Sequence, residues 1–322
     1  MYFPYLYGKQ KELIAIRSLS PVLAADARVQ PVVEPVRSES GTLRRTLEEC
    51  ETSELTTWVV TNPFRADFGS FRPSDSLKWG MEVLNKVKSR SYARPTLMLS
   101  DNLKPTAVRE FNAAFAGEEV GLVVLPTTWY AAKVLDELKS VEVARVFFKG
   151  PHPSTESVSL MGKHRSVWVE DRFPLRPRNA DYEGRHFFTD RHATYASSGW
   201  GGFSDYALMA PEPSEGGGPP GAVAFHLSYY DKSSPHKHVH VEHFVSDRTD
   251  RDDADTGGKF LEALSKFQRA ARRSGTSFGL TAAASDYLSR AFNSDPPTLG
   301  TNKQLGVMHH LELMSGLMAG RF

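Results

Sequence analysis

Residues 96–149 read TLMLSDNLKPTAVREFNAAFAGEEVGLVVLPTTWYAAKVLDELKSVEVARVFFK, and their pattern sets the architecture of the chain. Three short runs of apolar and β-branched residues recur here, at Thr96–Ser100, Val120–Leu125 and Val143–Lys149. Longer segments with helical spacing separate them, over Pro105–Phe115 and around Tyr130–Leu138. Such alternation is typical of βα units, and runs this continuous in hydrophobicity indicate parallel strands buried on both faces.

The same alternation extends toward the N-terminus and beyond residue 149. Further strands are expected at Tyr2–Tyr7, Val29–Val36, Thr57–Thr61 and Ser166–Glu170, and further helices at Lys9–Leu19, Gly41–Cys50 and Ser74–Ser89. Seven strand-like runs at intervals of roughly 25 to 35 residues favour an α/β fold, a (β/α)8 TIM-like barrel. An open doubly wound sheet is the alternative, but the first turn, Tyr7-Gly8-Lys9-Gln10, lacks the Gly-rich fingerprint of that fold.

The pattern changes after Asp171. Residues 172–221 are rich in Gly, Pro, Ser and aromatic residues, and we expect their one strand-like stretch, Tyr206–Ala210, to be the eighth barrel strand. Alternating apolar and polar residues predict an antiparallel hairpin from Ala222–Tyr230 and His238–Val245. Helices are expected at Lys259–Arg273, Ala282–Phe292 and Lys303–Met318. We therefore predict a single barrel-type domain over 1–322, with a loop and β-hairpin insertion at 172–247 and a C-terminal helical segment at 256–322.

The composition excludes several classes of protein. The 322 residues include 39 Lys+Arg and 38 Asp+Glu, so the formal net charge of +1 argues against a dedicated nucleic-acid binder. Local basic clusters at 172–178 (RFPLRPR) and 269–273 (RAARR) keep a nucleic-acid role open. The longest apolar runs are far shorter than the ~20 residues that cross a bilayer, so we expect no membrane association. A single cysteine excludes a disulfide framework and suits a reducing compartment, and we expect a cytoplasmic protein.

The ends of the predicted strands carry the candidate catalytic groups, because barrel enzymes place their active sites there. We expect catalytic roles for Lys9, Glu34, Lys149, Glu170 and Asp171, and substrate binding by Asn62 and Asp101. Glu34 is the most informative, because it lies among apolar residues in VVEPV, where an unpaired buried carboxylate costs several kcal/mol. Carboxylates beside two lysines could hold a divalent cation and an anionic substrate, or perform acid–base catalysis.

A histidine cluster in the predicted hairpin is the second candidate site. His236, His238, His240 and Glu242 alternate along one strand, and His226 lies on the facing strand. Imidazole and carboxylate groups on neighbouring strands are typical transition-metal ligands. Side chains at i and i+2 lie far apart for tetrahedral chelation, so a solvent-facing hairpin is the competing interpretation. The candidate metal ligands are His226, His238, His240 and His243. In the last helix, His309, His310 and Glu312 form no i,i+4 ligand pair, and we expect them to pack or to form hydrogen bonds.

Six stretches distributed over the chain carry a resemblance. They are MYFPYLYGKQKEL at 1–13, PVVEP at 31–35, RNADY at 178–182, GFSDY at 202–206, HFVSD at 243–247 and MHHLELM at 308–314. In them the chain resembles a family of uncharacterised bacterial proteins related to the phage beta-protein group. The resemblance implies a cytoplasmic barrel-type protein, encoded beside a partner gene and acting in phage conflict. It implies no catalytic set, but it directs attention to Arg178, Asn179, Asp181, Ser204 and Asp205, which we expect to bind substrate and to cover the barrel mouth.

Three functional hypotheses follow from these residues. The first is a TIM-barrel hydrolase or lyase that acts on an anionic or phosphorylated small molecule held by Lys9 and Lys149. The alternative is a non-catalytic binding or sensing subunit that acts with a partner protein in phage defence through an exposed apolar or aromatic surface of Tyr195, Trp200, Phe203 and the hairpin. A third hypothesis makes Lys9 a Schiff-base lysine for pyridoxal phosphate, as in some barrel enzymes.

Overall fold

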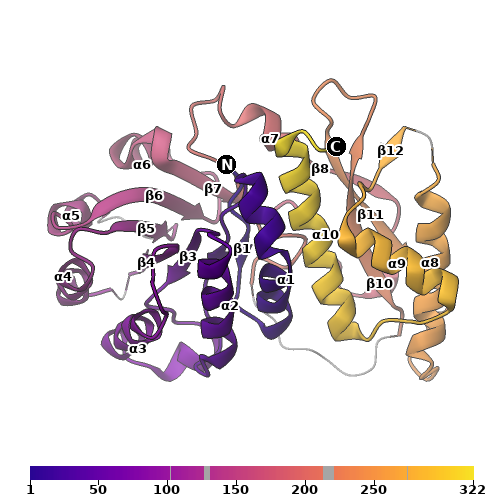
Figure 1. Cartoon of the computed structure of the whole chain (residues 1–322), viewed down its shortest axis with the longest axis horizontal. Coiled ribbons are helices and arrows are strands. Elements are labelled where there is room, and N and C mark those ends of the chain that lie inside the picture. Colours follow the sequence, from indigo (N-terminus) through magenta and orange to yellow (C-terminus); the bar gives the residue numbers. More distant parts are fainter. Residues whose placement is uncertain (102, 127–130, 213–220, 274) are drawn as a thin grey trace. The chain divides into compact units, whose positions relative to one another are not determined.

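The computed structural model of the chain describes residues 1–101, 103–126, 131–212, 221–273 and 275–322 (Figure 1). The chain divides into two units. The first consists of Met1–Asp171 and Thr194–Tyr206, and the second of Arg172–Ala193 and Ala207–Phe322. We describe each unit by itself.

The first unit is built on one parallel sheet of eight strands. In spatial order they are β1 (Tyr5–Leu6), β2 (Val32–Val33), β3 (Thr57–Val60), β4 (Ala93–Leu99), β5 (Glu119–Val124), β6 (Glu142–Lys149), β7 (Ser166–Glu170) and β9 (Ser204–Asp205). A parallel bridge joins Tyr2 to Phe203, so the chain before β9 returns to the chain before β1. The sheet therefore nearly closes into a barrel, which confirms the predicted TIM-like architecture.

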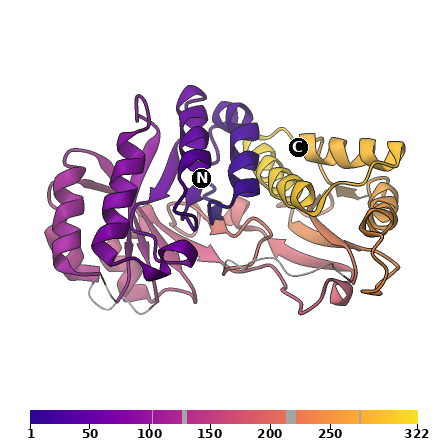
Figure 2. The same ribbon diagram turned by 90° about the horizontal axis from the view of Figure 1, so that it is seen from below.

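Helices surround this barrel (Figures 1 and 2). They are α1 (Gln10–Asp26), α2 (Gly41–Thr52), η1 (Ala66–Ser70), α3 (Pro73–Asn85), α4 (Pro105–Ala114), α5 (Ala131–Glu137), α6 (Thr155–Met161) and η2 (Lys163–Arg165). Inside the barrel, large side chains from several strands form one core that includes Tyr5, Trp58, Met98 and Phe147. Because the strands are covered by helices outside and by this core inside, they need apolar residues on both faces, as the continuous runs predicted.

The eighth strand differs from the prediction, which placed it at Tyr206–Ala210. The strand is Ser204–Asp205, which pairs with Val169 and Glu170 of β7. Ala207 and Leu208 have φ values of 48° and 63°, in the left-handed region, so the backbone there is not that of a β-strand. The prediction was wrong because it followed hydrophobicity, whereas the strand itself is a polar pair of residues. The Oγ of Ser204 donates a hydrogen bond to the carbonyl oxygen of Phe3.

The second unit has its own antiparallel sheet. Its strands lie in the order β12 (Thr276–Ser277), β10 (Ala224–Asp231), β11 (Val239–Val245) and β8 (Arg185–Thr189). The remaining helices of the chain are η3 (Asn179–Asp181), α7 (Arg191–Thr194), α8 (Thr256–Ala270), α9 (Ala282–Asn293) and α10 (Leu299–Ala319). The pairing of β10 with β11 confirms the predicted hairpin, with Phe225 opposite Phe244. In the described part of the chain, no helix combines the length and the apolar character that crossing a bilayer requires.

Aromatic side chains form the core of the second unit. Phe225 and Phe244 from the hairpin pack with Phe260 and Phe267 of α8 and with Tyr287 of α9. The sequence predicts the hairpin as an insertion and these helices as a C-terminal segment of one barrel-type domain. In the structure they share this core, which is separate from the core of the barrel.

Buried polar residues connect α10 to β10 and to the start of α9 through hydrogen bonds. The imidazole of His309 bonds through Nε2 to the carbonyl oxygen of Ser228, at 2.7 Å, and through Nδ1 to Oγ1 of Thr281, at 2.8 Å. Nδ1 of His310 lies 3.0 Å from Oγ of Ser228, and Glu312 accepts a hydrogen bond from the backbone N–H of Ala282. These contacts confirm the expectation that the three residues form hydrogen bonds.

Candidate active site

The carboxyl ends of the barrel strands bring two distant charged residues together. Side chains alternate between the two faces of a strand, and Val32 of β2 and Phe147 of β6 belong to the core inside the barrel. Glu34 and Lys149 lie two residues further along the same strands, so they also face the interior, at its carboxyl end. Both were predicted as catalytic residues.

Glu34 and Lys149 form an ion pair across the barrel. Nζ of Lys149 lies 3.1 Å from Oε2 of Glu34, and the two side chains are 4% and 0% exposed. In the eight-stranded order, β2 and β6 stand four positions apart, which is half of the ring. The pair therefore links opposite strands through the interior, a contact that only closure of the sheet makes possible.

Two further residues donate hydrogen bonds to the Glu34 carboxylate. Arg65, in the loop after β3, donates from Nη1 to Oε1 at 2.8 Å. Tyr5, on β1, donates from its hydroxyl to Oε2 at 2.5 Å. The Arg65 side chain is 16% exposed, which makes it the member of this group with most access to solvent.

The environment keeps Glu34 ionised. Burial alone would raise the pKa of Glu34, but the charges of Lys149 and Arg65 and the hydrogen bonds from Tyr5 and Arg65 outweigh it and lower the pKa. Burial and the negative charge of Glu34 raise the pKa of Tyr5 well above its ordinary value, so its hydroxyl stays protonated. At neutral pH Glu34 is therefore a fixed negative charge and a hydrogen-bond acceptor.

Three tyrosine rings surround the ammonium group of Lys149. Nζ lies 4.4 Å from the ring centroid of Tyr5, 4.9 Å from that of Tyr7 and 5.8 Å from that of Tyr206. It also donates a hydrogen bond to the hydroxyl oxygen of Tyr7, at 3.0 Å. Aromatic faces and a carboxylate both stabilise a positive charge. The arrangement therefore favours a charged ammonium group over a nucleophilic amine.

The three ionic groups do not cancel. Glu34 supplies one negative charge, whereas Lys149 and Arg65 supply two positive charges. The three come from the ends of β2, β6 and β3, at the face where barrel enzymes bind their substrates. Two cations thus lie against one carboxylate at this end of the barrel, which we call the mouth site (Glu34, Arg65, Lys149, Tyr5, Tyr7 and Tyr206).

Two of the predicted catalytic residues, Glu34 and Lys149, are in contact in the mouth site. Lys9 is the half-buried residue that precedes α1, Glu170 is the buried last residue of β7, and Asp171 is exposed just beyond it. Asn62, predicted to bind substrate, is buried and bonds through its amide to the backbone of Met98, which links the ends of β3 and β4. Asp101 is exposed after β4.

The residues singled out by the family resemblance fall in both units. Ser204 and Asp205 form β9 of the barrel, where Asp205 accepts a hydrogen bond from the hydroxyl of Tyr2 at 2.7 Å. Arg178, Asn179 and Asp181 belong to the second unit, and Arg178 forms an ion pair with Asp181. The predicted role of this set as one cover over the mouth stays a prediction.

Two of the four candidate metal ligands of the hairpin lie against each other. His226 lies opposite His243, and their Nδ1 atoms are 2.6 Å apart, so the two rings share one hydrogen bond. His240 lies opposite Tyr229 and stacks on its ring, and His238 is a half-buried residue just before β11. Among the residues that the structure describes, no three His, Cys, Asp or Glu side chains gather as a metal site would require.

Sequence reasoning did not identify four members of the mouth site, Arg65, Tyr5, Tyr7 and Tyr206. Tyr5 and Tyr7 alternate with Leu6 on the first strand, and this period of two is the signal that could have placed both inside the barrel. Arg65 gives no such signal, because it lies in a loop after β3 and reaches Glu34 only through the tertiary fold.

A comparison of the chain with protein-family models and with curated proteins finds no match. The function of the chain is therefore inferred from the geometry of the mouth site.

Proposed function

We propose that the protein is a barrel enzyme, a hydrolase or lyase that acts on an anionic or phosphorylated small molecule at the mouth site. The observation that carries this proposal is the buried ion cluster of Glu34, Lys149 and Arg65 at the carboxyl end of the barrel. A structural ion pair needs one cation for each carboxylate, whereas this carboxylate has two. Of the two cations, Arg65 is the more exposed to solvent and to a dissolved anion.

In this proposal each residue has a distinct role. Arg65, at the more accessible side, holds the anionic group through the planar donor geometry that suits phosphate and carboxylate. Lys149 stabilises negative charge that develops on the substrate during the reaction, as fixed cations do in electrostatic catalysis. Glu34 is a positioning residue, because it holds both cations in place and its lowered pKa keeps it charged.

The experiment that tests the proposal measures anion binding by the full chain. Thermal unfolding is followed with inorganic phosphate, pyrophosphate, sugar phosphates and dicarboxylates, and compounds that raise the midpoint are then followed for turnover by NMR. The variant is Arg65→Met, because Arg65 is the least buried of the three ionic residues. The matched control is Arg37→Met, which removes an arginine of the same unit whose ion pair with Asp67 lies at the surface.

We expect at least one anion to raise the midpoint of the wild type and of Arg37→Met, and to lose this effect in Arg65→Met. An anion that stabilises all three proteins equally binds elsewhere and contradicts the proposal. No stabilisation by any of the anions contradicts it as well.

We propose as a second function the non-catalytic binding or sensing role beside a partner protein in phage defence, which the family resemblance implies. Phe203 is buried, and Tyr195 and Trp200 are half-buried, so they offer little surface to a partner. The observation that supports this role is instead the exposure of Leu280, just before α9, and of Phe292, near the end of α9, at 90% and 83%. The test is co-purification with the product of a neighbouring gene. Wild type is expected to retain it and Leu280→Glu/Phe292→Glu to lose it, whereas equal retention contradicts a role of this surface.

A further inference from the structure

The second unit contains a cavity of about 1190 Å3 that no part of the proposed barrel chemistry uses. It is lined by the segment around η3, by the start of β10 and by the first turns of α10. Ligand sites are typically concave spaces of about 300–1,000 Å3 that combine apolar surface with a few polar groups. The size is sufficient for a small molecule of nucleotide dimensions.

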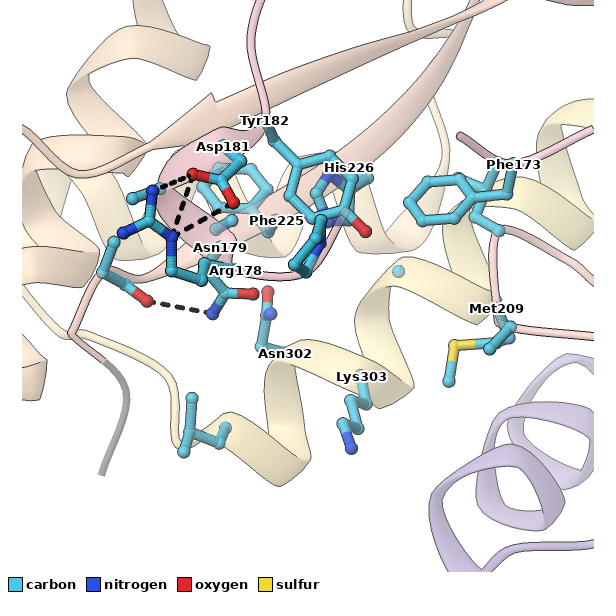
Figure 3. A pocket seen from close by; sticks show the side chains of 18 of the residues that line it. Phe173, Arg178, Asn179, Asp181, Tyr182, Met209, Phe225, His226, Asn302 and Lys303 are labelled. Atoms are coloured by element: carbon cyan, nitrogen blue, oxygen red, sulfur yellow. Dashed lines mark hydrogen bonds and ion pairs between the residues drawn. The ribbon is translucent and has the colours of Figure 1, made fainter. Parts of the chain in front are cut away.

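One wall of the cavity consists of three aromatic rings. The ring centroids of Tyr182 and His226 lie 4.5 Å apart, and those of Phe173 and His226 lie 5.0 Å apart. Figure 3 shows the three side chains next to one another on the same side of the cavity. The hydrogen bond between His226 and His243 fixes the orientation of the imidazole. The wall is therefore preformed, and because its rings are tilted against one another by 38° to 64°, a planar ring can stack on one of them at a time.

The opposite wall is polar and comes from α10. Asn302 and Lys303 lie there, across from the aromatic wall (Figure 3). The Oδ1 atom of Asn302 accepts a hydrogen bond from the hydroxyl of Tyr287 at 2.7 Å, which orients its amide group. Lys303 has no hydrogen bond or ion pair with any residue of the described chain, so its positive charge is not neutralised there.

The charged residues among the described lining of the cavity are mostly positive. The described lining residues include three cations, Arg178, Arg251 and Lys303, and one acid, Asp181. Asp181 is bound by Arg178, whose Nη2 donates to Oδ1 at 2.6 Å. Arg251 and Lys303 thus contribute two positive charges that the described lining does not offset.

We propose that this cavity binds a free nucleoside phosphate. The planar base stacks on the wall of Tyr182, Phe173 and His226, while the phosphate group lies toward Lys303 and Arg251. The same chemistry occurs in a nucleic-acid strand, but the near-zero net charge of the chain lacks the electrostatic attraction that strand binding requires. The ligand is therefore a free nucleotide.

Isothermal titration calorimetry on the full chain tests this proposal. The probes are the four ribonucleoside monophosphates, with adenosine, ribose 5-phosphate and a deoxyadenosine dodecamer as separate arms. The variants are Lys303→Ala, which removes a cation of the lining, and Tyr182→Leu, which removes a stacking ring. Matched controls are Lys232→Ala, an exposed lysine of the same unit, and Tyr182→Phe, which keeps the ring.

We expect at least one monophosphate to bind more tightly than adenosine, ribose 5-phosphate or the dodecamer. Lys303→Ala and Tyr182→Leu each weaken it about tenfold, while both controls bind like the wild type. Circular dichroism of each variant verifies that it is folded. Equal binding of ribose 5-phosphate, tighter binding of the dodecamer, wild-type affinity in both cavity variants, or no binding of any monophosphate overturns the proposal.

Discussion

Nζ of Lys149 and Oε2 of Glu34 meet at 3.1 Å, although the residues are 115 positions apart and belong to opposite strands of the barrel. The contact joins the geometry of the fold to the proposed chemistry. It is formed by closure of the sheet, and together with the ion pair of Arg65 and Glu34 it places two cations around one buried carboxylate.

Lys149→Met is expected to destabilise the protein by about 3–5 kcal/mol, because it leaves Glu34 buried without its main ion-pair partner. The double variant Glu34→Gln/Lys149→Met should lose less than the sum of the two single losses, by about 1–3 kcal/mol. Denaturant unfolding of the wild type, Lys149→Met, Glu34→Gln and the double variant measures these losses. Lys86→Met is the control, because its ion pair with Glu82 lies at the surface and is worth under about 1 kcal/mol. Additive losses would show that the two side chains are not coupled.

The lowered pKa of Glu34 predicts a pH dependence of stability. A carboxyl group whose pKa falls below its unfolded value of 4.5 stabilises the fold above that pH, and the contribution disappears as the pH falls through the folded pKa. The free energy of unfolding of wild type minus that of Glu34→Gln should therefore be constant near neutrality and shrink below about pH 4.5. Denaturant unfolding across this range measures it. A difference that grows on acidification contradicts the prediction.

Gly80 in α3 lies against the backbone of Thr61, the residue that follows β3. A Cβ atom at this position would lie 2.0 Å from the carbonyl oxygen of Thr61 and 2.5 Å from its Cα atom. Gly80→Ala should therefore force the helix away from the barrel and cost about 1–3 kcal/mol or more, despite the better helix propensity of alanine. Gly69→Ala, where the nearest atom is 4.0 Å away, is the matched control. Equal thermal midpoints of the two variants would refute the packing argument.

Burial of His309 predicts that the stability of the second unit also depends on pH, through a histidine instead of a carboxyl group. Burial lowers the pKa of His309 from 6.5 to about 4, so the folded state keeps the ring neutral while the unfolded state takes up a proton. The resulting loss of stability between pH 6.5 and pH 4 is about 3 kcal/mol. His309→Gln should be less stable than wild type at neutral pH and should lose less stability on acidification. Hydrogen exchange of the β10 and α10 amides resolves this unit, and an unchanged acid response in the variant would contradict the assignment.

The sequence predicted the parts of the fold that hydrophobic runs determine. Seven barrel strands and the hairpin follow from such runs, because their side chains pack on one or both faces. The eighth strand was misplaced, because Ser204 and Asp205 are polar and form a strand only through their pairing with β7, which is distant in the sequence. β8 was not predicted, since Arg185–Thr189 (RHFFT) is short and half polar, and its pairing with β11 is a long-range contact.

The candidate site was predictable to a similar degree. Glu34 and Lys149 could be identified one at a time, as a carboxylate inside an apolar run and a lysine at the end of another. That they touch each other could not be deduced, because it depends on closure of the barrel. Arg65 could not be predicted either, since its loop position carries no pattern in the sequence.

The central claim is that the mouth site holds an anion between Arg65 and Lys149. A crystal structure of the full chain soaked in tungstate, a heavy analogue of phosphate, tests it most directly through the anomalous signal of tungsten. The account predicts a tungstate ion within hydrogen-bond distance of the Arg65 guanidinium, on the side of Lys149. A mouth site without tungstate, in crystals that bind the ion elsewhere, would contradict it.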